Sequence, residues 1–353
     1  MKSKQLVFII LVVALVHVVL LLMLKSGHGS GKKEGGQQGT EEIAKPEPSE
    51  EPSPVIPPAP EPPSPDPLDS VKPYGDGYFT RDIKPLPASI KQMEGFCKSG
   101  IAIDLDSKRI LWEKDPKTPR PMASLTKMMT ALVAVRKMRL SNGTITPDTM
   151  IKVTAEAVKI NDRQVWLDPR ESFSFTDILK CIMIHSANDC AYLMAEYMGN
   201  GNVQAFVEEM NSQARELGCR QFTFVNPHGL PAAKGADNSA SPVELAYLAS
   251  VLLDIPEITR WSGVSVDYLR ENDEAYKKRN NGKAFMLVSS NKLLRSCNGV
   301  NGMKTGFTNK AGYCIVVTCE RTSRRAVVVL MGCPDSKSRD NLGKALVDWI
   351  YQN

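Results

Sequence analysis

A serine and a lysine three residues apart, Ser124 and Lys127, form the chemically most informative pair in the sequence. They open an apolar segment with helical periodicity, and residues three apart lie on one helix face with Cβ atoms about 5–6 Å apart. The Lys127 amine can therefore reach the Ser124 hydroxyl. Apolar surroundings lower the pKa of a lysine, so its neutral amine can act as a general base. The pair predicts a serine nucleophile activated by a lysine, at a helix start whose unpaired N–H groups suit an oxyanion.

Two further motifs carry side chains suited to the same chemistry. Ser186 and Asn188 stand where two predicted helices meet, so that a second hydroxyl can relay protons and an amide can hold a peptide group. Lys304 and Thr305 can bind a carboxylate, and Gly306 lets another backbone approach closely. Each motif alone also has an ordinary structural explanation, a helix cap for the first and a turn for the second.

The serine-lysine spacing recurs twice elsewhere. Ser30 and Lys33 lie in a Gly- and Lys-rich stretch without the apolar residues of a packed core. Ser289 precedes Lys292 without a following apolar helix. Ser124 is therefore the preferred nucleophile.

The order of the three motifs resembles that of the active-site serine penicillin-recognising enzymes. The sequence is similar, more specifically, to the low-molecular-mass D-alanyl-D-alanine carboxypeptidases over residues 88–351. The segments that carry this resemblance are Ala123–Thr130, Ser186–Asp189, Asn226–Pro231, Ser290–Leu294 and Gly302–Tyr313. The resemblance implies an α+β fold of the β-lactamase/transpeptidase type, with an antiparallel sheet flanked by helices, an all-helical lobe, and the active site between them.

The resemblance also implies catalytic roles. Ser124 would attack the carbonyl of the terminal D-Ala–D-Ala bond of a peptidoglycan stem peptide, and Lys127 would accept its proton. Ser186 would help to pass a proton to the leaving D-alanine. Water would then hydrolyse the acyl-enzyme, and β-lactam antibiotics would acylate the same serine as inhibitors. No cofactor and no metal are expected.

Substrate-binding roles follow from the same resemblance. Asn188 would orient the peptide, while Lys304 and Thr305 would bind its terminal carboxylate beside Gly306. The oxyanion would rest on the backbone N–H groups of the nucleophile and of Phe307.

The sequence departs from its relatives in three places. Ala187 stands where glycine is more frequent, and no arginine adjoins Ser290, where some relatives bind the substrate carboxylate. Residues 261–282 form an enlarged, charged connection.

Other functions share part of this pattern. Endopeptidase or transpeptidase action on peptidoglycan cross-links uses the same residues and stays open. A class A β-lactamase would need a Glu-x-x-x-Asn motif where the sequence has Asn226–Gly229, and a catalytically inactive wall-binding module would not need every required side chain. A His-based triad lacks its Gly-x-Ser-x-Gly motif, and His185 and His228 have no carboxylates at metallopeptidase spacing.

Hydrophobic periodicity predicts mixed α and β structure from residue 90 onward. The predicted strands are 100–106, 109–113, 313–319 and 326–331, and the predicted helices are 124–139, 175–184, 189–197 and 338–351. The strands pair into hairpins at both ends of this region with helices between them, which favours an antiparallel sheet plus a helical lobe.

The N-terminal part predicts a membrane tether. Residues 6–24 are apolar without formal charge, about the length that crosses a bilayer, and Lys2 and Lys4 place residues 1–5 in the cytoplasm. A cleaved signal peptide is the alternative. Eleven of the 24 prolines fall between Pro46 and Pro67, so residues 25–75 predict a disordered periplasmic linker before a catalytic domain at 76–353. The chain is expected in the cytoplasmic membrane, with its catalytic domain in the periplasm or cell envelope.

Eight cysteines follow the predicted anchor, where disulfides are permitted. They stand in apolar runs without Cys-x-x-Cys or zinc-ligand spacing, which favours mostly free thiols in the core and leaves one or two disulfides open. The residues after position 72 carry a net charge of +7, from 37 basic and 30 acidic side chains, which is spread rather than clustered, so nucleic acid is not an expected partner.

Overall fold

The computed structural model describes residues 66–232 and 235–353. The predicted membrane anchor, residues 6–24, and most of the predicted linker lie outside these residues. Among the helices of the described ranges, none combines the length and apolarity needed to cross a bilayer.

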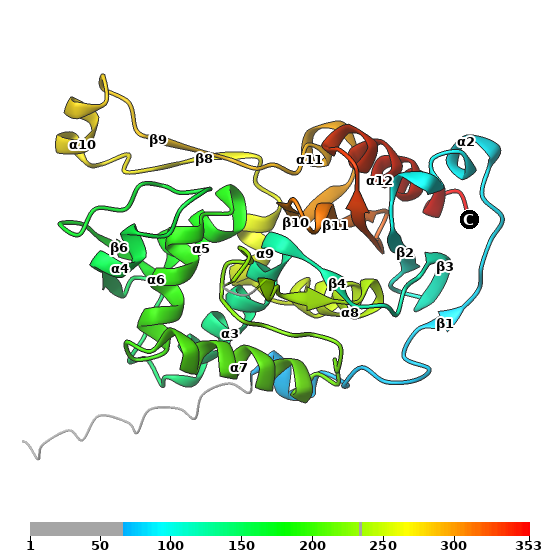
Figure 1. Ribbon diagram of the computed structural model, residues 1–353, viewed down its shortest axis with the longest axis horizontal. Helices are drawn as coiled ribbons and strands as arrows, with labels where there is room; N and C mark the ends of the chain where they lie inside the picture. The colour runs from blue at the N-terminus through cyan, green and yellow to red at the C-terminus, as the bar shows by residue number, and fades with distance from the viewer. Residues whose placement is uncertain (1–65, 233–234) are drawn as a thin grey trace, which may run out of the picture. The chain divides into compact units, whose positions relative to one another are not determined.

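The described residues form a sheet with helices on both faces and a group of helices beside it (Figure 1). The strands are β1 (Thr80–Arg81), β2 (Ser99–Asp104), β3 (Arg109–Lys114), β4 (Arg120–Pro121), β5 (Met150–Lys152), β6 (Ser172–Ser174), β7 (Ser239–Ala240), β8 (Val266–Leu269), β9 (Phe285–Val288), β10 (Val300–Thr308), β11 (Gly312–Arg321) and β12 (Arg324–Cys333). The α-helices are α2 (Ala88–Lys91), α3 (Lys127–Leu140), α4 (Ala155–Val158), α5 (Phe175–Lys180), α6 (Asn188–Met198), α7 (Val203–Glu216), α8 (Pro242–Leu252), α9 (Pro256–Ser262), α10 (Glu274–Arg279), α11 (Leu293–Ser296) and α12 (Ser336–Ile350).

The main sheet has six strands in the order β1-β3-β2-β12-β11-β10. All neighbours are antiparallel except β1 and β3, and both predicted hairpins, β2–β3 and β11–β12, are confirmed. The first long strand pairs with the last, with Ile103 opposite Val327. This closure leaves β10, the strand that carries Lys304 to Phe307, at the edge of the sheet.

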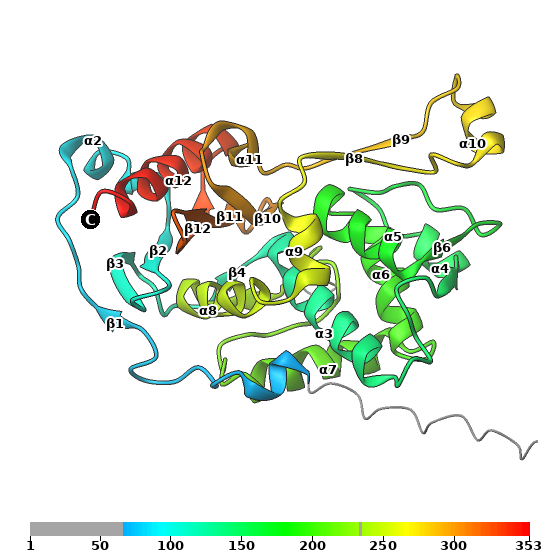
Figure 2. The same cartoon turned by 180° about the vertical axis from the view of Figure 1, so that it is seen from behind.

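The central strands are apolar on both faces because helices cover both faces. Val316 and Val329 belong to the core on the α8 side, and their neighbours Val317 and Val328 belong to the core under α12. Figure 2 shows α8 and α12 on opposite sides of the strands. Full burial of each valine stabilises the fold by roughly 1.5–3 kcal/mol, so this two-sided core fixes the position of β10.

The helical lobe is built around α3, which packs against α6, α7 and α8. The helix is buried around most of its circumference, so that even Lys127 and Thr130 are inaccessible, rather than along the single stripe that the sequence predicts. It also begins later than predicted, because Ser124 lies in a 3₁₀ turn, η3 (Ala123–Thr126). Ala123 enters that turn with a left-handed φ of 48°.

The second motif follows an irregular turn. The helix predicted at 175–184 ends at Lys180 and continues as a π-helical turn, η4 (Cys181–His185). Ser186 then adopts a left-handed conformation, with φ 64° and ψ 32°, before α6 begins at Asn188. The two helices therefore meet at this motif, as predicted.

The folded body begins earlier than the predicted boundary at residue 76. Leu68 is buried in the core, the Arg139 guanidinium lies 3.2 Å from the Asp66 carboxylate, and the ring of Tyr74 packs 5.4 Å from that of Tyr247. Residues 66–75 thus belong to the folded body rather than to a disordered linker. The high proline content of the preceding residues predicted a linker here, although a few side chains of this segment anchor it to the folded body.

The enlarged connection predicted at 261–282 contains β8 and α10. Strand β8 pairs with β9 to form a two-stranded arm, and α10 lies at the tip of this arm (Figures 1 and 2). The arm is fixed to the helical lobe by Arg270. Its guanidinium is buried, lies 2.7 Å from the Glu171 carboxylate and donates to the carbonyl oxygens of Val165 and Trp166.

Candidate active site

The turn that carries Ser124 is enclosed by two glycines. A Cβ at Gly306 would lie 2.8 Å from the Met122 carbonyl oxygen and 3.0 Å from the Ser124 nitrogen. Gly229, with a φ of +88°, approaches the Ala123 carbonyl closely in the same way. The predicted close backbone approach at Gly306 is therefore confirmed, and it places β10 directly against the Ser124 turn.

Lys127 lies beneath Ser124 and is completely buried. Its Nζ is 3.1 Å from the Ser124 Oγ, 2.7 Å from the Asn188 Oδ1 and 2.6 Å from the His228 carbonyl oxygen. Burial lowers the pKa of Lys127 to about 7, while the nearby Asp189 carboxylate opposes this shift. A lysine with this pKa is present largely as the neutral amine just above neutral pH, and can accept a proton from the serine.

Asp189 is the buried carboxylate on this side of the site. It accepts backbone N–H groups from Val165, Leu167 and Cys190, at 3.1, 3.4 and 2.9 Å. Its burial nevertheless raises its pKa. The carboxylate therefore holds the loop around Val165 next to the start of α6.

Lys304 lies beneath the other side of the site and is almost completely buried. Its Nζ donates to the Ser186 Oγ at 2.9 Å and to the Thr305 carbonyl oxygen at 3.0 Å. Burial lowers its pKa well below the usual range, and the positive charges of Lys127 and Arg163 add to this effect.

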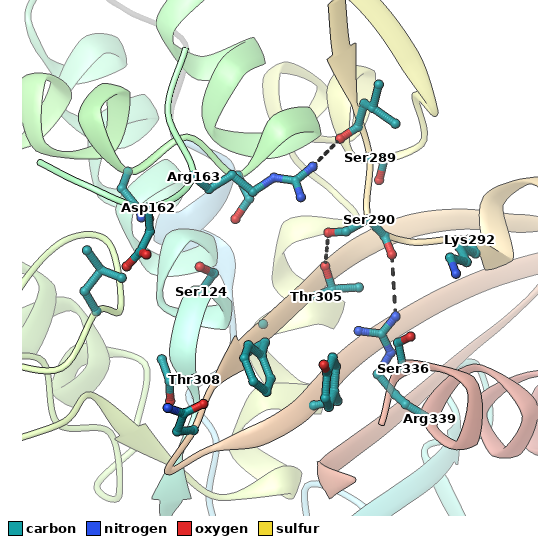
Figure 3. A pocket seen from close by; sticks show the side chains of 18 of the residues that line it. Ser124, Asp162, Arg163, Ser289, Ser290, Lys292, Thr305, Thr308, Ser336 and Arg339 are labelled. Atoms are coloured by element: carbon teal, nitrogen blue, oxygen red, sulfur yellow. Dashed lines mark hydrogen bonds between the residues drawn. The ribbon is translucent and has the colours of Figure 1, made fainter. Parts of the chain in front are cut away.

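A cleft of about 690 Å³ opens above these residues. Its lining residues are Ser124, Asp162, Arg163, Ser186, Asn188, Leu230, Pro231, Val288, Ser289, Ser290, Lys292, Arg295, Thr305, Gly306, Phe307, Thr308, Asn309, Tyr313, Ser336 and Arg339. Figure 3 shows Ser290, Thr305 and Arg339 gathered on one side, and Ser124 and Thr308 on the other.

All the predicted site residues meet here. Six of them line the cleft, and the other two, Lys127 and Lys304, lie beneath it. Phe307 is 48% exposed, and its ring packs 4.2 Å from that of Tyr313. The three motifs, far apart in sequence, thus form one site.

Three cleft residues had no role in the sequence-based prediction. The Ser290 hydroxyl lies 2.5 Å from the Thr305 hydroxyl, and the Arg339 guanidinium is 3.5 Å from the Ser290 carbonyl oxygen. Arg163 donates to the carbonyl oxygens of His185 and Val288, which ties the Ser186 turn to the arm. Neither arginine belongs to a recognisable motif. Ser290 stood within a matching segment, but without a sign that its hydroxyl faces Thr305.

His185, next to the second motif, has a structural role. The His185 Nδ1 accepts the Val288 N–H at 3.3 Å, and its ring meets Phe285 edge-on at 5.5 Å. Burial lowers its pKa to about 4. Within residues 66–232 and 235–353, no group of three or more His, Cys, Asp and Glu side chains is arranged to hold a metal ion.

All eight cysteines are buried free thiols, which confirms the prediction of mostly free core thiols. Burial raises the pKa of Cys97, Cys297 and Cys314 to about 11. These thiols are protonated at neutral pH and do not compete with Ser124 as nucleophiles.

A sequence model of the peptidase S11 family, described as D-alanyl-D-alanine carboxypeptidase, matches residues 88–335. The chain belongs to this family. It is 33% identical to D-alanyl-D-alanine carboxypeptidase DacF of Bacillus subtilis, over 72% of this chain and 62% of that protein. It is 30% identical to DacA of Haemophilus influenzae, over 72% and 61% respectively. The chain thus spans about three fifths of the length of these curated relatives.

Solved structures share the fold. The D-alanyl-D-alanine carboxypeptidase DacD of Francisella tularensis is similar with a TM-score of 0.65 and 25% identity, over 79% of this chain and 75% of that one. Penicillin-binding protein D2 of Listeria monocytogenes, solved in a cefotaxime-bound form, has a TM-score of 0.61 and 24% identity, over 71% and 96%. The predicted α+β fold of the transpeptidase type is confirmed.

Proposed function

We propose that the chain is a penicillin-sensitive, serine-type D-Ala–D-Ala carboxypeptidase that removes the terminal D-alanine from peptidoglycan stem peptides. The observation that carries this proposal is the completely buried Lys127 amine, 3.1 Å from the Ser124 Oγ and with its pKa lowered to about 7. Family membership supports the substrate class.

Acylation begins when neutral Lys127 takes the hydroxyl proton of Ser124, whose Oγ attacks the carbonyl carbon of the terminal peptide bond. The C–N bond then breaks, and the departing amine of D-alanine receives a proton. Ser186 delivers this proton in the proposed mechanism, a role supported by its position in the cleft lining and by its hydroxyl, which accepts a hydrogen bond from the Lys304 amine at 2.9 Å. Water hydrolyses the resulting ester, and β-lactams form the same ester.

Substrate is held from both sides of the cleft. The carboxylate of the terminal D-alanine binds Lys304 and the Thr305 hydroxyl, which Ser290 supports at 2.5 Å. The oxyanion accepts the backbone N–H groups of Ser124 and Phe307, a pairing supported by the tight contact of Gly306 with the Ser124 turn. The Asn188 amide, held by the Asn161 carbonyl at 3.0 Å, orients the peptide.

A second candidate is a D,D-endopeptidase that cuts peptidoglycan cross-links. The cleft continues past Thr305 to Lys292 and Arg295, so the leaving-group end has space and positive charge beyond what a single D-alanine fills. The leaving amine of a cross-link belongs to a larger group that carries its own carboxylate.

The proposed cellular arrangement is a single-pass membrane protein. Residues 6–24 would anchor the chain in the cytoplasmic membrane, and a proline-rich linker would hold the catalytic domain in the periplasm or cell envelope. The sequence pattern supports this arrangement, as does the family's extracytoplasmic substrate.

The test uses the full chain in mild detergent, with a labelled penicillin and a pentapeptide ending in D-Ala–D-Ala. We expect a covalent label on Ser124, free D-alanine, and loss of both in Ser124→Ala. No label on Ser124 would refute the proposal. Label without D-alanine release, together with cleavage of cross-linked dimers, would assign the endopeptidase instead.

A further inference from the structure

A second cavity adjoins the cleft beyond Phe307. Its volume is about 450 Å³, and Phe307 and Asn309 line both spaces. Its other walls come from the residues before β2, from the turn after β10 and from the end of β12, through Gly95, Phe96, Cys97, Lys98, Lys310, Gly312, Gly332, Cys333 and Pro334.

The proposed function determines which part of the substrate reaches this cavity. Lys304 and Thr305 bind the terminal carboxylate, and the scissile carbonyl lies between Ser124 and the N–H of Phe307. Because β10 runs onward from Phe307 to Thr308 and the turn at Asn309, the acyl portion of the stem peptide must leave in that direction. The cavity therefore lies on the acyl side of the scissile bond.

Lys98 supplies an uncompensated positive charge to this cavity. Its side-chain carbons pack against Gly332, which has a φ of +72°. A Cβ at position 332 would lie only 2.8 Å from these carbons, so the absence of a side chain there makes room for Lys98. Among the described residues, no hydrogen bond or ion pair engages the Lys98 ammonium. The side chain is thus positioned by packing and remains available for an anion.

The neighbouring charges do not neutralise Lys98. Lys310 also lines the cavity, but its ammonium lies 2.5 Å from the Asp237 carboxylate. The Asp335 carboxylate accepts the N–H and the hydroxyl of Ser338, at 2.8 and 2.7 Å, where it caps α12. Glu94 is paired with Lys91 at 2.6 Å.

Aromatic side chains complete the cavity. Phe96 and Phe307 line the cavity and are 37% and 48% exposed. They offer an apolar contact for the aliphatic part of an amino acid whose carboxylate reaches Lys98.

We propose that the Lys98 cavity is a specificity subsite that binds a carboxylate on the acyl side of the stem peptide. Two positions of the peptide can supply this group, the α-carboxylate of a γ-linked D-glutamate at the second residue and the side-chain carboxylate of a diamino diacid at the third. The subsite rests on the proposed function and adds a preference for acidic over amidated peptides.

The experiment compares kcat/KM of the full chain for three pentapeptides that end in D-Ala–D-Ala. One carries both carboxylates, one is amidated at the second residue, and one has lysine at the third. In the unmodified chain we expect the doubly acidic peptide to exceed one of the other two by about three- to fivefold, the upper part of the range for an exposed ion pair. The change that loses this advantage, amidation at the second residue or lysine at the third, identifies the source of the carboxylate.

Lys98→Met should remove this advantage, Lys98→Arg should keep it, and Lys152→Met, which changes an exposed lysine on β5, should leave it unchanged. The rate of penicillin acylation should be the same in all variants, which shows that Ser124 and the fold are intact. Equal kcat/KM for the three peptides in the unmodified chain, or an unchanged preference in Lys98→Met, would overturn the subsite. Absence of acylation in the unmodified chain would instead refute the proposed function.

Discussion

Lys127 in the helical lobe and Lys304 on the edge strand are buried on opposite sides of one cleft, yet their surroundings differ. Lys127 has three oxygen partners, from Ser124, Asn188 and His228, and the Asp189 carboxylate favours its charged form. Its pKa is lowered only to about 7. Lys304 has two oxygen partners, and the charges that act on its pKa are all positive.

The difference supports the two separate roles proposed for these lysines. Lys127 is balanced between its protonation states, as a general base must be. No negatively charged group among the described residues acts on the pKa of Lys304, so a carboxylate that binds beside it would favour its protonated form. Burial thus prepares one lysine to exchange a proton and the other to receive a negatively charged ligand.

The largest expected effect is on acylation, and it comes from replacing Lys127 in the helical lobe. Lys127→Met should lower the rate of acylation by penicillin about 10²–10⁴-fold, because the variant lacks the general base for Ser124. The measurement is stopped-flow acylation with a fluorescent penicillin. The matched control is Lys137→Met on the same helix, which removes a partly exposed amine paired with Glu209. Normal acylation in Lys127→Met would show that another group takes the proton.

On the sheet side, Lys304→Met should lower kcat/KM for the pentapeptide by about 10–100-fold, the range for a lost hydrogen bond to a charged group. Lys180→Met is the control, since Lys180 is a buried lysine that donates to the Tyr268 carbonyl at 2.7 Å outside the cleft. If both variants lose activity equally, the effect comes from general destabilisation rather than from lost binding.

The pH profile separates the two lysines in the unmodified chain. Only neutral Lys127 can accept the serine proton, so acylation should rise about tenfold per pH unit below its pKa and level off above a pH of about 7. The check is the acylation rate from about pH 5 to about pH 9 with a neutral fluorescent β-lactam. A rate that falls as pH rises through 7 would contradict the assignment of the base.

The smallest effect concerns stability. Burial of each lysine amine costs desolvation free energy, which a methionine avoids. Both Met variants should therefore raise Tm, by about 2–4 °C for each kcal/mol gained in the free energy of unfolding. Lys304→Met should gain more than Lys127→Met, since Lys304 has fewer oxygen partners and no nearby carboxylate. Calorimetry at pH 7.5, about half a unit above the pKa of Lys127, measures both. A lower Tm for Lys304→Met would show that its hydrogen bonds outweigh the cost of burial.

The parts of the site that recur as short motifs are predictable from the sequence. Ser124, Ser186 and Lys304 could be identified because their neighbours form recognisable patterns, and the hairpins could be identified from alternating or β-branched runs. The catalytic and binding roles of these residues stay predictions until the variants are measured.

The remaining features depend on contacts between distant segments. Arg339 reaches the cleft only because α12 packs on the sheet beside Ser290, and Lys98 faces its cavity only because Gly332 lies opposite it. The early start of the folded body was missed for the same reason, since Asp66 finds Arg139 only in the assembled lobe. Periodicity within one segment carries no information about such partners.

The pairing of the first long strand with the last has a consequence for biosynthesis. Arg324 on β12 donates to Asp104 on β2 across 220 residues, so the sheet closes only when nearly the whole chain is present. Closing a loop of that length is entropically costly and slow compared with forming the helices between its ends. A partly synthesised chain can already contain Ser124 and Lys127, but it lacks β10, whose Phe307 would complete the proposed oxyanion site. Under the proposed function, the capacity to hydrolyse a substrate would therefore arise last, after the C-terminal strands have joined the sheet.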